Sequence, residues 1–226
     1  MDGNGRWAEA RGLSRVLGHR AGAEAVPPIV AACQEAGIRV LTLYAFSWEN
    51  WDRPSSELNG LMSLLVQFLR RELPALRAQQ VRLRAIGRLN ELPAGPLEDL
   101  NRVIAETATC DRMTLVLALS YGGRQELVDA TRRIAAQVRD GHLLPEQITE
   151  SLIAQHLYTA DLPDPDLIIR TSGEMRLSNF LLWQGSYAEL YVTPTLWPDF
   201  TKDDLQEAMA AYQRRERRFG KTVAAT

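Results

Sequence analysis

The first seven residues of the chain combine side chains that could hold a phosphate-bearing ligand. Asp2 is followed directly by Gly3-Asn4-Gly5-Arg6-Trp7. Glycines let a backbone turn with positive φ and approach a ligand closely, and successive N–H groups in such a turn form a concave anion site. A carboxylate can hold a divalent cation beside a phosphate, and an arginine fork matches phosphate oxygens. The segment predicts diphosphate binding, although a surface Asn-Gly turn beside a core tryptophan would contain the same residues.

Two further polar clusters follow apolar runs of the sequence. Residues 47–54 (Ser-Trp-Glu-Asn-Trp-Asp-Arg-Pro) come after the apolar run 39–46, and residues 170–179 come after the apolar run 167–169. In open α/β sheets, ligands bind beyond the carboxyl ends of the strands. The three clusters together therefore predict a diphosphate clamp, although a lone arginine usually forms only a surface salt bridge. Arg15 and His19 follow the first cluster by a short helix and could join it.

The elements that must position these clusters alternate along the chain. Strands are predicted at 39–46, 81–86, 113–119, 167–169 and 188–192, and helices at 21–36, 55–76, 95–109, 124–138, 145–156 and after Thr201. Pro27 and Pro28 predict a kink or a restart of the first of these helices. Thr201 with Asp204 is typical of a capping box. The alternation predicts one α/β domain over residues 1–226, with a mostly parallel central sheet flanked by helices.

Composition narrows the classes of function. The chain has 226 residues and a formal net charge of −2, so no basic field predicts a nucleic-acid partner. Cys33 and Cys110 lack metal-ligand or redox spacing and predict reduced thiols in a cytoplasmic protein. No apolar run reaches the ~20 residues of a membrane span. The P-loop, dinucleotide-binding and serine-hydrolase motifs are all absent.

At this point the residues resemble a known family, the cis-prenyltransferases (isoprenyl transferases such as undecaprenyl diphosphate synthase). The matching segments follow family order over nearly the whole chain: 2–8, 18–22, 44–47, 49–51, 53–54, 121–124, 170–191, 196–200 and 215–220. The resemblance implies Mg²⁺-dependent condensation of isopentenyl diphosphate onto an allylic diphosphate such as farnesyl diphosphate. The product would be a Z-polyprenyl diphosphate, a lipid-carrier precursor for cell-wall synthesis. The alternatives are a shorter Z-isoprenyl product, a generic phosphate-binding module, or a non-catalytic subunit, which should lack Asp2, Arg170 and Arg176.

The resemblance also implies roles for individual positions. Asp2 matches the catalytic aspartate that holds Mg²⁺, and Glu189 matches a second metal-associated acid. Asn50 falls where a proton-accepting role is assigned, although the departing diphosphate could take that proton. The allylic diphosphate and the mobile segment beside it would involve Gly3, Asn4, Gly5, Arg6, Trp7, Arg15, His19, Ser47, Trp48, Glu49, Trp51 and Arg53. Isopentenyl diphosphate would be held by Arg170, Arg176, Leu177 and Ser178.

Further expectations concern the surroundings of the site. Arg218-Phe219-Gly220 resembles a carboxy-terminal element that contacts substrate across a homodimer. An apolar tunnel for the prenyl chain would be lined by helix 58–76 and strands 40–46 and 115–119, although most of those residues form core. The family's apolar strand before the aspartate would precede Met1, so we expect the domain to lack its first strand here. The product passes to the membrane, so a peripheral position at its inner face fits a cytoplasmic enzyme.

Overall fold

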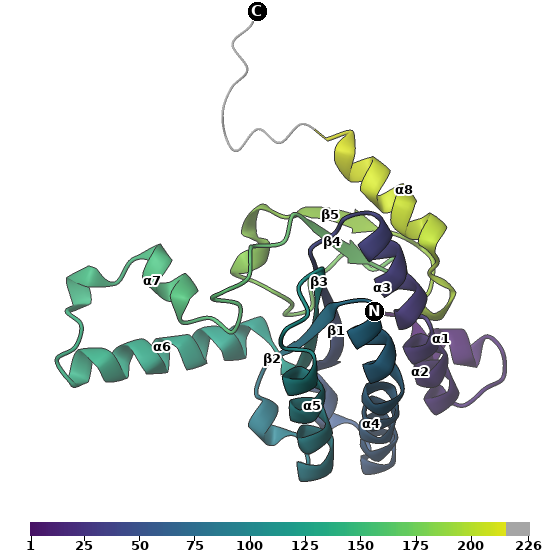
Figure 1. The fold of residues 1–226 in the computed structure, drawn as a ribbon, viewed down its shortest axis with the longest axis horizontal. Helices are drawn as coiled ribbons and strands as arrows, with labels where there is room; N and C mark the ends of the chain where they lie inside the picture. Colours follow the sequence, from purple (N-terminus) through teal and green to yellow (C-terminus); the bar gives the residue numbers. More distant parts are fainter. Residues whose placement is uncertain (216–226) are drawn as a thin grey trace, which may run out of the picture.

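Two parallel sheets carry the fold in the computed structural model, which describes residues 1–215 (Figure 1). β1 (Val40–Ser47), β3 (Met113–Tyr121) and β2 (Val81–Ile86) form one sheet in the order β1-β3-β2. β4 (Leu167–Arg170) and β5 (Glu189–Val192) form the second. β3 is buried over almost its whole length, as expected for a central parallel strand.

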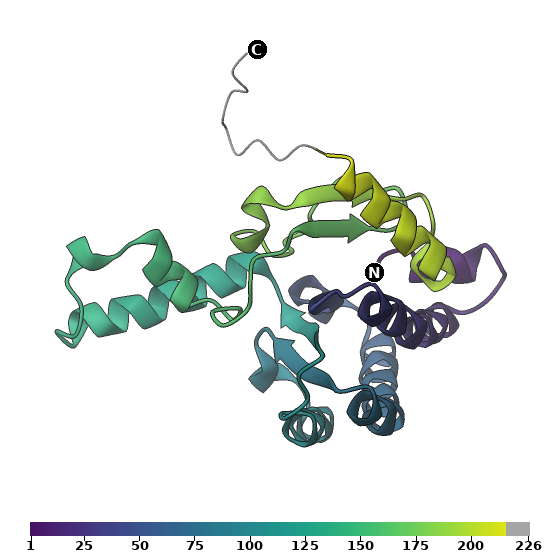
Figure 2. The ribbon, with the colours of Figure 1, turned by 45° about the horizontal axis from the view of Figure 1, so that its top comes forward.

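Helices cover the larger sheet and hold the main core. α3 (Val26–Glu35), α4 (Ser55–Ala78) and α5 (Ala94–Glu106) bring apolar stripes to this core, which includes residues of β2 and β3. α8 (Lys202–Gln213) packs beside β5 and α3. α6 (Gly123–Arg139) and α7 (Glu150–Gln155) extend away from the body as an arm (Figures 1 and 2). The fold class agrees with the prediction: the chain forms a single α/β domain with parallel strands and flanking helices.

The strands are divided between two sheets, so the expectation of one central sheet was wrong. β1 pairs with β3 along one edge, and its other edge lines a cleft whose opposite wall includes β4. Paired strands lie about 4.8 Å apart. Within residues 1–215, β1 and β4 are not paired with each other, because the cleft separates them. Met1 lines the same cleft. A strand preceding Met1 would therefore enter between β1 and β4, and that expectation stays a prediction.

Two predicted helices are each divided. The region 21–36 forms α2 (Arg15–Glu24) and α3, which restarts with Pro27 in its first turn, where a missing N–H is tolerated. The region 145–156 forms a 3₁₀ turn (Pro145–Gln147) and then α7, whose N-cap Thr149 accepts a hydrogen bond from the Leu152 amide. The capping box at Thr201 is confirmed, because the Asp204 carboxylate accepts from the Thr201 amide at 2.9 Å.

Close packing of α1 (Asn4–Glu9) on α2 positions the amino-terminal segment. Gly3 precedes α1 with φ of 105°, in the region that favours glycine. A Cβ atom at Gly18 would lie 2.1 Å from the Asn4 carbonyl oxygen, and one at Gly22 would lie 2.5 Å from Asn4 Oδ1. These two glycines on α2 therefore permit the crossing that places residues 2–6 beside the side chains of α2.

Candidate active site

The polar clusters meet at the carboxyl ends of β1 and β4, at one end of a cleft of ≈ 1430 Å³ that runs along both strands. The amino-terminal segment, α2, the turn after β1 and the loop after β4 all contribute to its walls. The predicted site residues that line it are Asp2, Gly3, Asn4, Gly5, Arg6, Arg15, His19, Ser47, Glu49, Asn50, Arg53, Arg170, Arg176, Leu177 and Ser178. Segments far apart in sequence are thereby brought to one edge of the fold.

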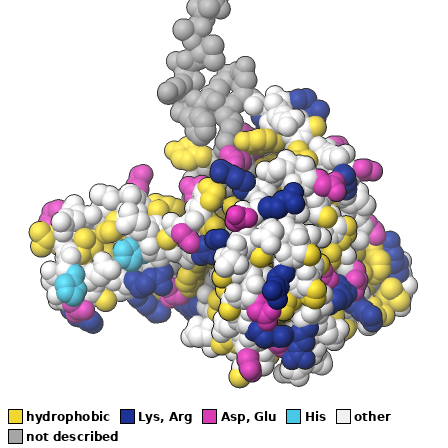
Figure 3. All heavy atoms as spheres, viewed as in Figure 1, with side chains coloured by type: hydrophobic (Ala, Val, Ile, Leu, Met, Phe, Trp, Pro, Cys, Tyr) yellow, Lys and Arg dark blue, Asp and Glu magenta, His cyan; other side chains and the backbone are white. Residues whose placement is uncertain are grey.

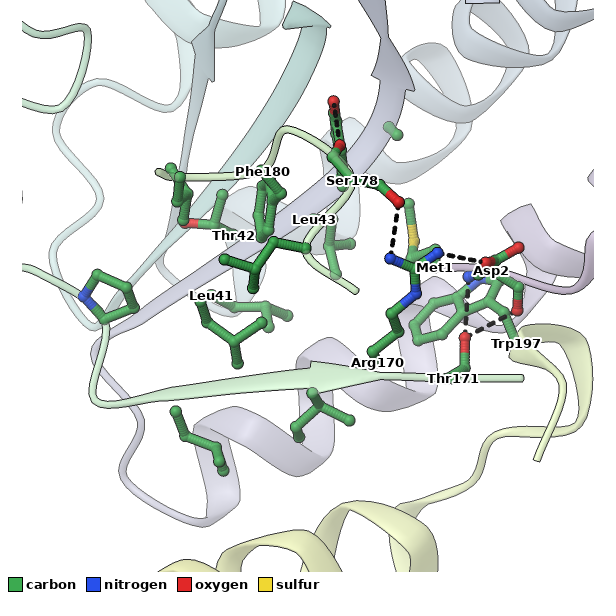
Figure 4. A pocket seen from close by; sticks show the side chains of 18 of the residues that line it. Met1, Asp2, Leu41, Thr42, Leu43, Arg170, Thr171, Ser178, Phe180 and Trp197 are labelled. Atoms are coloured by element: carbon green, nitrogen blue, oxygen red, sulfur yellow. Dashed lines mark hydrogen bonds and ion pairs between the residues drawn. The ribbon is translucent and has the colours of Figure 1, made fainter. Parts of the chain in front are cut away.

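Arg170, at the end of β4, connects the amino-terminal segment with the loop after β4 (Figure 4). Its Nη2 donates to Asp2 Oδ2 at 2.9 Å, and its Nη1 donates to Ser178 Oγ at 2.8 Å. The same Nη1 also donates to the Arg176 carbonyl oxygen. Burial raises the pKa of Asp2, but the hydrogen bond and charge of Arg170 outweigh it, so this pKa lies below its usual value of 3.8. Asp2 is therefore an anion at neutral pH.

Backbone contacts fix the position of Asp2. Thr171 Oγ1 accepts from the Asp2 amide and donates to the Asp2 carbonyl oxygen, both at 2.8 Å (Figure 4). The Trp197 amide donates to the same carbonyl at 3.0 Å, and the Gly3 amide donates to Asp2 Oδ1 at 2.7 Å. Because main chain and side chain are both held, the carboxylate has a defined direction at the rim of the cleft.

Arg6 lies on the other side of Asp2. Its Nη2 donates to Ser172 Oγ at 2.6 Å and lies 3.4 Å from Asp2 Oδ1. Its Nη1 donates to Glu174 Oε1 at 3.1 Å. Glu174 also pairs with Arg176, so one carboxylate orders two arginines at the edge of the cleft. Both guanidinium groups remain substantially exposed and accessible to an anionic ligand.

Glu57, in the first turn of α4, gathers three further candidate residues. Its Oε1 accepts from Arg53 Nη1 at 2.8 Å and lies 3.3 Å from His19 Nε2, and its Oε2 lies 3.7 Å from Arg15 Nε. Burial raises the pKa of Glu57, but the charge of Arg53 and the hydrogen bond from His19 bring it below its usual value. Burial also lowers the pKa of His19, and the bond to Glu57 only partly offsets this. His19 is therefore a neutral imidazole at pH 7.

The side chain of Asn50 has a structural contact of its own. Its Oδ1 accepts from the Ser47 amide at 3.1 Å, at the start of the 3₁₀ turn Trp48–Asp52. This bond uses one of the two acceptor positions of the amide oxygen, and a neutral amide is in any case a weak base. Both points favour the departing diphosphate over Asn50 as proton acceptor.

Four predicted site residues do not line the cleft. Trp7 Nε1 donates to Asp199 at 2.7 Å, Trp51 Nε1 donates to Ser120 Oγ at 2.9 Å, and the ring of Trp48 carries the Arg88 guanidinium 4.7 Å from its centroid. These three rings anchor the segments that carry the polar residues. Glu189 pairs with Arg215 and lies opposite Leu167, at the amino end of β5. Arg218-Phe219-Gly220 lies outside the described residues.

Asp2 suits a magnesium ion, whereas Glu189 lies at the opposite end of the β4–β5 pair from Arg170, the partner of Asp2. Leu167, opposite Glu189, is three residue steps from Arg170 along β4, a rise of roughly 10 Å at ~3.3 Å per residue. Within residues 1–215, no group of three or more acidic, histidine or cysteine side chains could hold a metal ion. Mg²⁺ commonly binds through one or two carboxylates together with substrate phosphates and water. Asp2, half-exposed and ionised, suits that arrangement.

Sequence reasoning missed Glu57 as the partner of Arg15, His19 and Arg53. Its spacing four residues after Arg53 is a signal for a helical ion pair, but it gives no hint of the contacts from α2. Thr171 lies in the predicted polar cluster 170–179, but it was not singled out as a site residue.

A family model described as "Putative undecaprenyl diphosphate synthase" matches residues 1–220. The isoprenyl transferase of Heliobacterium mobile is 54% identical over 97% of this chain and 85% of its own length, and that of Thermotoga maritima is 52% identical over 97% and 94%.

Two solved structures are also similar. Lavandulyl diphosphate synthase from Lavandula x intermedia, in complex with dimethylallyl diphosphate, has a TM-score of 0.96 and 39% identity, covering 98% of this chain and 95% of that one. A probable undecaprenyl diphosphate synthase from Campylobacter jejuni has a TM-score of 0.78 and 38% identity, covering 89% and 92%. The chain belongs to the undecaprenyl diphosphate synthase family of isoprenyl transferases, and it is a prenyl-transferring enzyme.

Proposed function

We propose that the enzyme joins isopentenyl diphosphate to an allylic diphosphate, with farnesyl diphosphate as the primer, and forms a Z-polyprenyl diphosphate of the lipid-carrier type. The observation that carries this proposal is the contact of Arg170 with both Asp2 and Ser178. It joins two clusters of diphosphate-binding side chains, one at the amino terminus and one after β4. Two anionic head groups can then lie side by side at one rim.

The reaction requires the allylic C–O bond to break, leaving a carbocation and a strongly anionic diphosphate. Arg6, Arg15 and Arg53 surround the position proposed for that leaving group, and Gly5 leaves space for the guanidinium of Arg15, since a Cβ there would lie 3.0 Å from it. Guanidinium groups that are already positioned stabilise developing charge without reorganising. Mg²⁺ held by Asp2 would supply further charge neutralisation of the diphosphate.

The second substrate must place its alkene beside the cation. Arg170, Arg176 and Ser178 are proposed to hold its diphosphate, and such orientation can supply several kcal/mol of the barrier. The new C–C bond leaves a proton to be removed, and the departing diphosphate is the proposed acceptor because the neutral amide of Asn50 is a weak base whose Oδ1 already accepts from the Ser47 amide. The prenyl chain of the product is then longer by one isoprenyl unit with a cis double bond.

Apolar walls support a place for the prenyl chain. Leu41 and Leu43 of β1 line the cleft away from Asp2 and Arg170 (Figure 4). Leu61 of α4 lines it as well. A separate cavity of ≈ 90 Å³ is lined by residues of α3 and α4, among them Phe68 and Leu76, and by Leu115 of β3. We propose that α4, β1 and β3 guide the growing chain between these two spaces.

The length of the product is open to one specific alternative. The likeness to lavandulyl diphosphate synthase, solved in complex with dimethylallyl diphosphate, supports a five-carbon allylic substrate and a short product as the alternative. The match to the family model described as "Putative undecaprenyl diphosphate synthase" supports the long-chain product. Chromatography of products made with dimethylallyl or farnesyl diphosphate separates the two: elongation from farnesyl diphosphate to many isoprene units supports the long-chain proposal, and products ending after one addition contradict it.

A homodimer is the proposed assembly. The α6–α7 arm stands away from the body and shows hydrophobic side chains on the face in Figure 3. Val128, Leu144 and Ile148 of this region are exposed, and a second copy could cover such a surface. Light scattering is expected to give twice the 25.3 kDa chain mass, and a stable monomer at micromolar concentration would refute the dimer.

No helix within residues 1–215 has the length and apolar character needed to span a membrane.

Replacing Asp2 by alanine tests the proposed function directly. Asp2→Ala is expected to lower turnover of labelled isopentenyl diphosphate with farnesyl diphosphate and Mg²⁺ by at least ~10²-fold, the scale for losing one preorganised electrostatic group. Asp111→Ala removes an exposed carboxylate before the amino end of β3 and is the matched control. Near-parental turnover by a folded Asp2→Ala enzyme would contradict the assignment of Asp2, and a folded parent enzyme that cannot elongate the primer would refute the function.

Titration of His19 tests the electrostatics of the α2–α4 contact. Burial holds its pKa below 6.5 in the folded protein, so the stability from the neutral imidazole is present above that pH and is lost as the pH falls through the lowered pKa. Glu57→Gln removes a charge that raises this pKa, so NMR of the imidazole is expected to show a further decrease. Glu146→Gln, an exposed substitution on the 3₁₀ turn before α7, should leave the titration unchanged. An increase on Glu57→Gln would contradict the contact.

A further inference from the structure

Asn179 lies where three segments around the cleft come together. It follows Ser178, the hydroxyl partner of Arg170, and its backbone has φ of 64°. Asparagine is one of the few non-glycine residues that adopt this left-handed region readily. The residue is therefore suited by both backbone and side chain to the end of the loop after β4.

The amide of Asn179 has all its hydrogen-bonding groups engaged by defined partners. Nδ2 donates to Glu49 Oε1 at 2.8 Å and to Gln125 Oε1 at 3.0 Å. Oδ1 accepts from the Arg124 amide at 2.8 Å, and the main-chain carbonyl of Asn179 accepts from the Gly123 amide at 2.7 Å. One residue thereby ties the start of α6 to the turn after β1.

These contacts join two walls of the cleft whose strands, β1 and β4, are not paired with each other within residues 1–215. Glu49 belongs to the turn Trp48–Asp52, which follows β1 of the larger sheet. Asn179 belongs to the loop after β4 of the smaller sheet. The bond from Asn179 to Glu49 has a charged acceptor, which makes it stronger than a neutral hydrogen bond.

The neighbouring residue also packs against β1. Phe180 stacks on Tyr44 of β1 with ring centroids 4.6 Å apart, so the loop after β4 contacts the strand next to Asn179. The hydrogen bonds of the Asn179 side-chain amide fix the position of the loop at this residue. Displacement of Asn179 would move Ser178, and with it the hydroxyl that Arg170 Nη1 contacts.

We propose that Asn179 is a positioning residue that couples the turn after β1 to the Arg170–Ser178 clamp and thereby sets affinity for isopentenyl diphosphate. This inference rests on the proposed function, because that substrate is the one assigned to the clamp. Asn179 itself is held by four protein contacts and acts on substrate through Ser178 and Arg170. Its loss should raise KM for isopentenyl diphosphate more than it lowers kcat.

The decisive variant is Asn179→Asp, which keeps shape and the Oδ1 acceptor but places a carboxylate oxygen opposite Glu49. KM for isopentenyl diphosphate is expected to rise about 10-fold to 100-fold, the factor for losing a hydrogen bond to a charged group. Adding Glu49→Gln gives that position an amide donor for the new carboxylate. The double variant is expected to recover at least half of the logarithmic loss in KM.

Two controls separate this effect from added charge and from backbone strain. Asn101→Asp places the same charge at an exposed position of α5 and should leave KM unchanged. Asn179→Gly keeps the left-handed backbone and removes the amide, so its KM should also rise, without recovery on Glu49→Gln. A parental KM in folded Asn179→Asp or Asn179→Gly, or a double variant no better than Asn179→Asp, would overturn the inference.

Hydrogen–deuterium exchange gives a readout that does not depend on catalysis. Asn179→Asp is expected to accelerate exchange at both 47–53 and 176–181, with 81–86 unchanged as the internal reference. Faster exchange in only one of the two segments, or in neither, would overturn the coupling. If the parent enzyme failed to elongate an allylic primer, the proposed function would fall, while the exchange experiment would still decide whether Asn179 couples the two segments.

Discussion

The guanidinium of Arg170 is the contact on which the arrangement of the site depends. It stands at the end of β4 and donates to Asp2 on one side and Ser178 on the other. Without it, the Asp2 carboxylate would lose its direct contact with the end of β4, leaving the contacts of Arg6 with Ser172 and Glu174 and those of Thr171 Oγ1 with the Asp2 main chain. Arginine suits this place because its planar fork can satisfy two acceptors at once, which the point charge of lysine cannot.

The division of the strands into two sheets makes such side-chain contacts necessary. β1 and β4 line opposite walls of the cleft, so their loops are not aligned by a shared ladder of hydrogen bonds. Side chains align them instead: Arg170 at the end of β4 reaches Asp2, Glu57 pairs with Arg15 of α2 and with Arg53 just before α4, and Asn179 reaches the turn after β1. The groups proposed to bind two mutually repelling diphosphates are thereby held in place by contacts within the protein.

Sequence predicts local structure and residue chemistry here better than it predicts pairing. β2 has the predicted bounds 81–86, because its apolar run is short and bounded by turn residues. The division of the sheet was missed because apolar runs identify strands but not their neighbours. Trp7, Trp48 and Trp51 were expected around substrate, yet each ring makes a structural contact with a distant segment. Glu57 was overlooked because an acid in a first helical turn is ordinarily a helix-terminal charge.

Calorimetric titration of inorganic diphosphate, in the presence of Mg²⁺, tests most directly whether Arg170 organises an anion site at this rim. Arg170→Met removes the fork at the end of β4, and Arg112→Met makes the same change at an exposed position before the amino end of β3. The account predicts that the first substitution weakens diphosphate binding about tenfold or more, while the second leaves it at the parental value. Equal affinity in all three proteins would contradict it.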